Sequence, residues 1–433
     1  MNYMNRMIAA IIGLLFLPPV IAQDSPTTDL PIPAIDEITR VSEKTKASRR
    51  DRSLTCYLVA TKVHPVSEKG YVILTDHTED APLTSLQRLC DARKGKILPV
   101  SDFSNAWKNP EEWKQLKSQL KEIQPRFVAI APRPDTYGEW MLMSMLDLLS
   151  SLDEDRELDV FPGILAAPDQ ASFDALITRS INFKPQTRDT FKPFVLGQVV
   201  DGSPLGIRSL QKVGIMRKLF GGWGYDTPSF VMLKAKGAKQ KQITAEDVWY
   251  AVEPDEKKML KALPPDPAQA LDNSSLVITY GHGTPGVVCS VEVNAFKDVD
   301  FDGKIVLSGS CFSGSPNRWD IPLPSRLNDG PEKERFLVRA IQNGAVITFG
   351  HMKFNGGFPY LFPVLEAWLE GKTVGEGYQK LMNAILYKVK APPSEVLKGK
   401  KQTRMAGNML AYVVIGDPSL TPFQGIQREG KGK

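Results

Sequence analysis

The sequence contains few of the residues that build metal sites and disulfide frameworks. It has 4 cysteines and 4 histidines in 433 residues, and no CxxC, HxxxH or HExxH motif. Zinc sites and disulfide-stapled domains depend on such spacings, so we expect no metal and no cofactor. Among the cysteines, Cys56 and Cys90 are the least implausible disulfide pair, since both lie in the first half.

A strong charge excess is also lacking. The net charge is +5, and 24% of the residues are charged. A nucleic-acid-binding protein usually carries a much larger and clustered basic excess, so we expect no nucleic-acid partner. The hydrophobic content of 42% is that of a globular protein with a substantial core.

Long apolar runs are absent except near the N-terminus. A short polar start with one positive charge precedes the apolar run Met7–Val20, which is shorter than the 20 or so residues of a membrane span. Small residues follow at Val20-Ile21-Ala22, as at a signal-peptidase site. We therefore expect residues 1–22 to be a signal peptide and the mature protein to be periplasmic or extracellular, without a membrane span.

The rest of the chain divides into four parts. Residues 23–52 are rich in Pro, Thr, Ser and charge and indicate a flexible leader. Residues 53–186 and 187–425 each alternate β-rich runs with helical patterns, which is typical of α/β folds with a mostly parallel sheet. Residues 426–433 form a basic tail. We expect an N-terminal α/β subdomain followed by a C-terminal α/β subdomain, with helices flanking the sheets.

The periodicity also predicts the individual elements. Strands are expected at Leu54–Thr61, Tyr71–Thr75, Lys96–Val100, Phe127–Ala131, Val160–Ala166, Phe194–Val200, Leu276–Tyr280, Lys304–Leu307, Ala345–Phe349 and Ala411–Ile415. Helices are expected at Leu83–Arg93, Pro110–Ile123, Tyr137–Leu152, Phe173–Ile181, Ser209–Leu219, Ala245–Val252, Lys333–Asn343, Tyr360–Glu370 and Thr373–Tyr387, with a loop at Pro254–Pro267.

Two of these predicted strands lead into residue types that are common in catalytic sites. Leu276–Tyr280 leads into Gly281-His282-Gly283, and Lys304–Leu307 leads into Ser308-Gly309-Ser310-Cys311. Ligands of open α/β sheets bind beyond the carboxyl ends of the strands, so adjacent strands would present both side chains to one crevice. A thiol with an imidazole beside it is a nucleophile with its acid/base partner.

The small residues around the two side chains suit this chemistry. They let the chain turn sharply and let a substrate backbone approach the sulfur. Attack by the Cys311 thiolate on a carbonyl creates an oxyanion that requires nearby donors, and the backbone N–H groups of Gly283 and Cys311 are the natural candidates. His282 would polarise the thiol or protonate the leaving amine.

Four segments together resemble the caspase-like cysteine peptidases, a group that includes caspases, metacaspases, legumains and gingipains. The His-Gly and small-residue-Cys motifs of that group are similar to Tyr280–Gly283 and Ser308–Gly314. Two further segments, Asp159–Ile181 and Ala411–Leu420, resemble the gingipain branch. The resemblance implies a caspase-like three-layer fold and an endopeptidase with His282 and Cys311 as its catalytic dyad. It also implies an oxyanion hole at Gly283 and Cys311, and a protein or peptide as substrate.

Some other residues have weaker signals. Gly350 and His351 follow the predicted strand Ala345–Phe349 and are candidates for one wall of a substrate pocket. Asp417 precedes a proline in a turn and is expected to be structural. Gly221–Gly224 lacks the Lys-Ser/Thr of a phosphate loop and indicates a surface turn.

Two alternative functions stay open from the sequence. The chain departs from secreted gingipains in showing no immunoglobulin-like domain after Pro422, which motivates an inactive caspase-like module that binds a peptide or protein. The second alternative is an α/β-hydrolase acting on esters, with Cys311 as nucleophile and the later His351 as its base.

Overall fold

A computed structural model describes most of the chain from residue 70 onward. The described residues are 70–104, 109–199, 213–214, 216–233, 250–252, 260–316, 335–353, 361–389, 392–393, 395 and 403–426. The predicted signal peptide (1–22) and leader (23–52), Cys56, the predicted strand Leu54–Thr61 and nearly all of the basic tail lie outside these residues.

The first half alternates strands and helices as predicted. Its elements are β1 (Tyr71–Thr75), α4 (Asp80–Arg93), β2 (Lys96–Pro99), α5 (Pro110–Ile123), β3 (Phe127–Ala131), α6 (Glu139–Leu149), β4 (Phe161–Ile164) and α7 (Gln170–Asn182). Helix α5 shows how local sequence sets the boundaries. Asn109 accepts a hydrogen bond from the Glu112 N–H, Pro110 occupies the first turn, and Gln124 ends the helix in the left-handed conformation.

The second half contains more strands than the periodicity indicates. Its larger elements are β5 (Pro193–Val199), β6 (Ser229–Leu233), β7 (Tyr250–Val252), α9 (Pro265–Asp272), β8 (Leu276–Tyr280), β12 (Ile305–Ser308), α10 (Phe336–Gln342), β13 (Ile347–His351), α11 (Leu361–Leu369), α12 (Val374–Val389), α14 (Thr403–Leu410) and β14 (Tyr412–Ile415). Three two-residue strands lie between β8 and β12, namely β9 (Gly283–Thr284), β10 (Val287–Val288) and β11 (Val291–Glu292).

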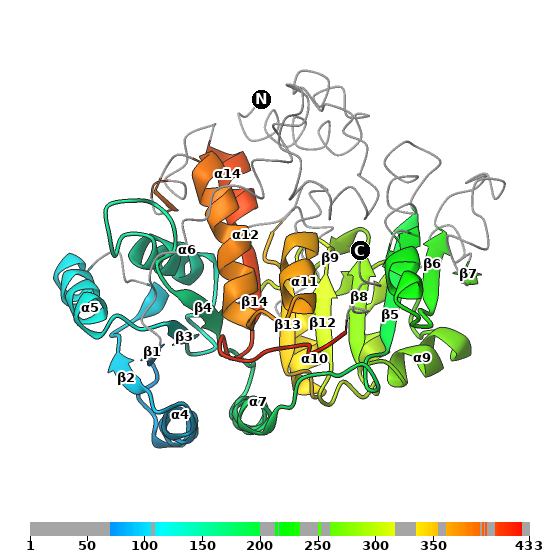
Figure 1. The fold of residues 1–433 in the computed structure, drawn as a ribbon, viewed down its shortest axis with the longest axis horizontal. Helices are drawn as coiled ribbons and strands as arrows, with labels where there is room; N and C mark the ends of the chain where they lie inside the picture. Colours follow the sequence, from blue (N-terminus) through cyan, green and yellow to red (C-terminus); the bar gives the residue numbers. More distant parts are fainter. Residues whose placement is uncertain are drawn as a thin grey trace, which may run out of the picture. The chain divides into compact units, whose positions relative to one another are not determined.

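Strands from both predicted subdomains pair into one sheet of 11 strands. Their order is β2-β1-β3-β4-β14-β13-β12-β8-β5-β6-β7, from the left to the right of Figure 1. All neighbours are parallel except β13 and β14, which are antiparallel. The strands from β2 to β14 therefore point one way, and the strands from β13 to β7 point the other way. The predicted α/β class with a mostly parallel sheet is confirmed, while the boundary near residue 186 stays a prediction.

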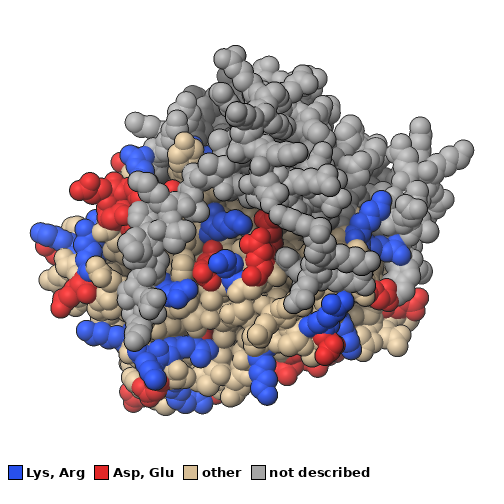
Figure 2. Space-filling model, in the orientation of Figure 1, with Lys and Arg blue, Asp and Glu red and all other residues tan. Residues whose placement is uncertain are grey.

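Helices flank the sheet on both faces. Helix α10 packs against β12, β13 and α7, and α7 packs on α4, which places these three helices on one face. Helix α12 covers β4 and also packs against α11 and α14. None of the helices in the described ranges combines the length and apolarity of a membrane span. On the described part of the face in Figure 2, basic and acidic side chains are intermingled.

The two halves of the sheet meet where β4 lies beside β14. A Cβ placed on Gly163 of β4 would lie 2.6 Å from the Gly416 carbonyl oxygen, so only glycine permits this approach. The Gly416 N–H in turn donates to the Ile164 carbonyl oxygen at 2.7 Å. The two segments on which the gingipain resemblance rests, around Gly163 and around Gly416, are thus neighbours in space.

Asp417 fixes this junction with a buried carboxylate. Its side chain has no exposed surface and accepts hydrogen bonds from the Tyr71 hydroxyl at 3.0 Å and from Arg93 Nε at 2.8 Å. Ser419 donates to the same carboxylate from its N–H and its hydroxyl. Burial and the neighbouring Asp417 raise the pKa of Tyr71. Asp417 therefore ties β1 and α4 of the first half to the end of β14, the structural role expected for it.

Two sequence predictions in the second half were wrong. Residues 250–252 of the predicted helix Ala245–Val252 form strand β7, because pairing with β6 overrides the local helical pattern. The predicted loop Pro254–Pro267 contains the start of helix α9, which begins at Pro265 with a proline in its first turn.

The Asp417 junction makes a prediction about stability. Replacing Asp417 with Asn leaves the buried end of Arg93 without its counter-charge, so we expect the free energy of unfolding to fall by about 3 kcal/mol. Asp174→Asn is the control, since the Arg88–Asp174 pair is nearly half exposed and contributes about 1 kcal/mol or less. Chemical denaturation measures both variants, and equal losses would contradict the role given to Asp417.

Candidate active site

Strands β8 and β12 are direct neighbours, and this pairing brings the two motifs together. They run parallel, with Thr279 opposite Ser308 at their carboxyl ends. The Thr279 hydroxyl donates to the Ser308 hydroxyl at 2.8 Å, and the Gly309 N–H donates to the Thr279 carbonyl oxygen at 2.7 Å. The segments that carry His282 and Cys311 therefore leave the sheet side by side at one edge.

Gly283 is in close contact with the main chain of the cysteine loop. A Cβ added at Gly283 would lie 2.3 Å from the Cys311 carbonyl oxygen and 3.1 Å from the Cys311 nitrogen. Any side chain at this position would force the two loops apart. The glycine after His282 is thus a requirement of the contact between the two motifs.

The small antiparallel sheet of β9, β10 and β11 follows His282 and sets the direction in which the Gly283 N–H points. Pro285 and Gly286, with φ +81° at the glycine, turn the chain between β9 and β10. The Cys289 N–H donates to the His282 carbonyl oxygen, and Gly283 lies opposite Val288. Because hydrogen-bonded and non-bonded pairs alternate in antiparallel ladders, the Gly283 N–H points away from β10.

The loop after Cys311 is held by contacts from several elements. Phe312 has φ +58°, a conformation that reverses the chain directly after the cysteine. The Phe312 N–H donates to the Lys353 carbonyl oxygen at 2.9 Å, and the Tyr137 hydroxyl donates to the Gly314 carbonyl oxygen at 2.7 Å. Lys353 also pairs with Glu139 at the start of α6. Residues of the first half thus brace the cysteine loop.

The two candidate catalytic side chains differ in exposure. Cys311 is 6% exposed and is not part of a disulfide, whereas His282 is exposed. The main chain of His282 is held from both sides, since its N–H donates to Gln198 Oε1 at 2.8 Å and its carbonyl accepts from Cys289 at 3.0 Å. An exposed histidine on a fixed main chain suits proton exchange with a bound substrate.

His351 lies at the same edge of the sheet, but its ring is buried. It ends β13, which is parallel to β12, and its side chain has no exposed surface. Its Nδ1 lies 2.7 Å from the Lys353 carbonyl oxygen, and its Nε2 lies 2.5 Å from the Asn408 carbonyl oxygen. Burial lowers the pKa of His351 to about 4. This geometry supports neither a pocket wall made by the ring nor a base for the ester-hydrolase alternative.

Gly350 lies in the same strand and packs tightly. A Cβ there would lie 2.6 Å from both the Ser313 hydroxyl oxygen and a methyl carbon of Leu337. Gly350 is therefore a close-packing position beneath the cysteine loop. Its predicted place in a substrate pocket stays a prediction.

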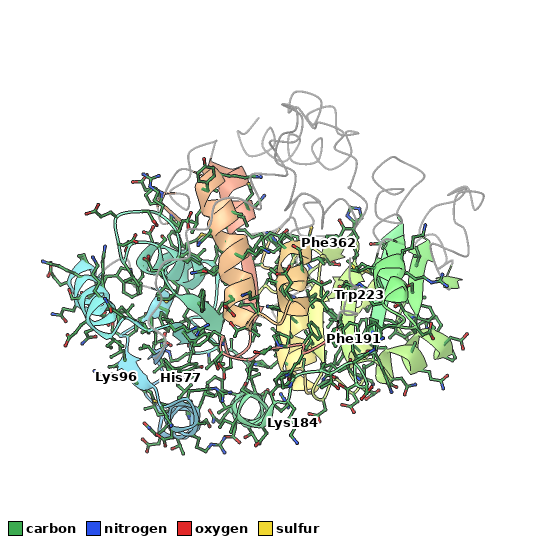
Figure 3. The ribbon with its side chains drawn as sticks, viewed as in Figure 1. His77, Lys96, Lys184, Phe191, Trp223 and Phe362 are labelled. Carbon is green, nitrogen blue, oxygen red and sulfur yellow. The ribbon has the colours of Figure 1, made fainter. Side chains whose placement is uncertain are left out.

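The other described histidine lies at the opposite edge. His77, labelled in Figure 3, follows the carboxyl end of β1, and the first-half strands point the opposite way from β8 and β12. Its ring packs against Phe173 with centroids 5.2 Å apart, and burial lowers its pKa. Of the histidines in the described residues, only His282 is both exposed and placed at the carboxyl ends of β8 and β12.

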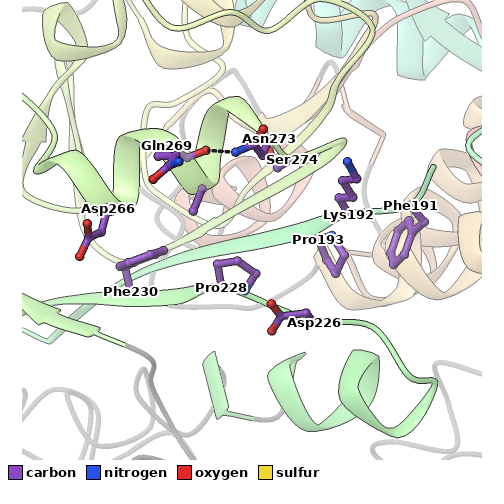
Figure 4. Close-up of a pocket in the computed structure, with 11 residues that line it drawn as sticks. Phe191, Lys192, Pro193, Asp226, Pro228, Phe230, Asp266, Gln269, Asn273 and Ser274 are labelled. Carbon is purple, nitrogen blue, oxygen red and sulfur yellow. Dashed lines mark hydrogen bonds between the residues drawn. The ribbon is translucent and has the colours of Figure 1, made fainter. Parts of the chain in front are cut away.

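Two further features of the described residues are separate from this edge. A hollow of about 610 Å³ lies at the amino ends of β5 and β6, where Phe191, Pro193, Pro228 and Phe230 form apolar walls (Figure 4).

Asp153, Asp155 and Asp159 have carboxylate oxygens within 4.8 Å of one another on the loop before β4. Two of these aspartates are exposed, as in many acidic clusters that hold no metal.

Several residues around the site were not found from the sequence. Gln198 falls within a predicted strand, and the polar partner it provides depends on β5 lying beside β8, which the sequence does not reveal. The turn at Pro285-Gly286 does have a sequence signal, because a Pro-Gly pair after a strand indicates a hairpin. Tyr137 and Lys353 reach the cysteine loop only through tertiary packing.

No protein-family model matches the sequence, and no curated protein matches it significantly. Two structures of the separase–securin complex from Saccharomyces cerevisiae match 67% and 70% of this chain, with TM-scores of 0.36 and 0.35 and identities of 13% and 12%. The match spans only 15% and 17% of those chains. An ornithine carbamoyltransferase from Burkholderia thailandensis matches 68% of this chain and 86% of its own, with a TM-score of 0.22 and 13% identity. Likenesses at these scores assign no activity.

The buried imidazole of His351 makes a prediction about pH. Its folded pKa of about 4 lies below the ordinary value of 6.5, so the fold favours the neutral ring. Its contribution to stability is complete above pH 6.5 and is lost as the pH falls toward 4, by about 3 kcal/mol. We expect His351→Gln to remove this part of the pH dependence in denaturation curves measured between pH 7 and pH 4. Parallel curves for the two proteins would contradict the assignment.

Proposed function

We propose that the chain is an exported cysteine endopeptidase of the caspase-like group. It hydrolyses peptide bonds through a dyad of Cys311 and His282 and a thioester acyl-enzyme. The observation that supports this most strongly is the packing of Gly283 directly against the Cys311 main chain, at the carboxyl ends of two adjacent parallel strands. In that arrangement a thiol, an imidazole and main-chain donors share one edge of the sheet.

The first chemical step is acylation. The Cys311 sulfur attacks the carbonyl carbon of the peptide bond, and the carbonyl oxygen takes on negative charge. We assign the N–H groups of Gly283 and Cys311 as its donors. The register of β9 and β10 supports this assignment for Gly283, because it turns that N–H away from the ladder. Such prearranged donors typically contribute about 3 to 4 kcal/mol to transition-state stabilisation.

The second role belongs to His282. The imidazole takes the thiol proton and gives it to the leaving amine, so the peptide bond breaks and Cys311 carries the acyl group as a thioester. It then takes a proton from a water molecule that attacks the thioester, and the acid product leaves with the thiol restored. An exposed ring on an anchored main chain supports this exchange with both substrate and water.

The finer assignments rest on sequence features. The resemblance of Asp159–Ile181 and Ala411–Leu420 to the gingipain branch supports that branch within the caspase-like group. The signal-peptide pattern of residues 1–22 supports export to the periplasm or the outside of the cell. Proteins and peptides are the substrates that this chemistry requires.

The proposal is tested by substitution of the dyad. We expect Cys311→Ala to abolish cleavage of a mixed peptide library and labelling by a thiol-reactive peptide probe, and His282→Ala to lower kcat/KM by at least about 10³-fold. Cys90→Ala is the matched control, since it removes another buried thiol in α4 and is expected to keep full activity.

The outcomes separate the alternatives. Wild-type turnover by Cys311→Ala would rule out the mechanism. Loss of activity on esters in His351→Gln but not in His282→Ala would favour the ester hydrolase. A folded wild-type protein that cleaves no peptide and retains a stable protein partner would favour the binding module.

A further inference from the structure

Gln198 lies beneath the histidine loop, in a strand that contributes no residue to the proposed dyad. It belongs to β5, which pairs with β8 in parallel, so that Gly197 lies opposite Tyr280 and Gln198 comes level with Gly281. A Cβ on Gly281 would lie 2.6 Å from the Gln198 Cβ. The missing side chain of Gly281 therefore leaves the room in which the Gln198 side chain, only 4% exposed, reaches the loop.

Both the oxygen and the nitrogen of the Gln198 side-chain amide form hydrogen bonds, and these bonds determine which atom lies on which side. The His282 N–H can only donate, so the atom it contacts at 2.8 Å must be the carbonyl oxygen Oε1. That leaves the Nε2 amino group to donate to the Ser290 hydroxyl. Gln198 thus links the main chain of His282 to the turn between β10 and β11.

That turn is strained and touches both loops of the site. Cys289 and Ser290 both have positive φ, +50° and +65°, in a tight turn where Asn-Gly is the usual choice. The Cys289 N–H donates to the His282 carbonyl oxygen, and its sulfur lies 3.7 Å from the hydroxyl of Ser310, the residue before Cys311. Strained backbone persists where surrounding contacts hold it in place, and such strain is concentrated at functional sites.

The described contacts hold the main chain of His282 on both sides of its Cα atom. Its N–H is bound by a side chain and its carbonyl by a main-chain N–H, and both partners connect through the turn at Cys289 and Ser290. The imidazole itself is exposed. Fixing this main chain fixes the point from which the ring extends.

We propose that Gln198 is a positioning residue for His282 and that Ser290 holds the Gln198 amide in its working orientation. This inference rests on the proposed function, because it assigns Gln198 an effect on the dyad of His282 and Cys311. Gln198 does not touch the reacting atoms. It acts by fixing the main chain of His282, so that the ring stays within reach of the Cys311 sulfur.

Two substitutions separate positioning from packing. Gln198→Met keeps the length of the side chain and removes both hydrogen bonds, so we expect kcat for peptide cleavage to fall by about 10²-fold while KM changes little. Gln198→Glu restores the bonds in either protonation state. As a neutral acid it accepts from His282 and donates to Ser290, and as a carboxylate it accepts from both. We expect it to recover most of the activity.

A second readout does not require peptide cleavage. The rate of Cys311 carbamidomethylation by iodoacetamide at pH 7, followed by peptide mapping, reports the thiolate that His282 stabilises. We expect a decrease of about tenfold or more in Gln198→Met and in His282→Ala, and a rate near that of wild type in Gln198→Glu. Gln379→Met is the control, because it removes a glutamine hydrogen bond to the Leu158 carbonyl away from the site.

The results distinguish the two proposals. If His282→Ala slows carbamidomethylation but Gln198→Met does not, the positioning role is overturned and the dyad stands. If His282→Ala leaves the rate unchanged, both the dyad and the positioning role are overturned. Equal losses in the Met and Glu variants would show that keeping the two hydrogen bonds does not keep the activity, which would also overturn the inference.

Discussion

The close approach of Gly283 to the Cys311 main chain is the contact on which the rest of the site depends. It is possible because β8 and β12 are adjacent and parallel, so their carboxyl-end loops emerge at the same edge. The glycine removes the side chain that would separate the loops. Other contacts then fix the main-chain path of each loop. The hairpin after His282 and the Gln198 side chain hold the histidine loop, and the chain reversal at Phe312 shapes the cysteine loop.

The reversal of direction inside the sheet decides which half holds the site. Strand β14 is antiparallel to β13 but parallel to β4, so the carboxyl ends of the first-half strands lie at the opposite edge. Among the described residues, the first half therefore brings no carboxyl end of a strand to the candidate active site. It contributes by bracing, through Tyr137 and Glu139 against the cysteine loop and through Tyr71 and Arg93 at Asp417. A buried carboxylate at such a junction couples the stability of the two halves.

Local sequence predicted much of the fold and the proximity of the loops after β8 and β12. The bounds of β1, α5, β3 and β8 agree with the predictions because turn residues and apolar periodicity mark their ends. The adjacency of the segments that carry His282 and Cys311 followed from the same strand-end reasoning, while their role as a catalytic dyad stays a prediction. Strand order and the reversal at β14 were not predictable, since they depend on contacts between segments far apart in the chain. Gln198 was missed for that reason, and His351 has the same strand-end pattern as His282 but a buried ring.

The proposed site depends on an electrostatic interaction between the Cys311 sulfur and the His282 ring. It is tested most directly by an NMR titration of the His282 imidazole in wild-type protein and in Cys311→Ala. A nearby thiolate favours the charged ring, so we expect the wild-type ring to hold its proton to higher pH than the ring in Cys311→Ala. Identical titration curves for the two proteins would contradict the account.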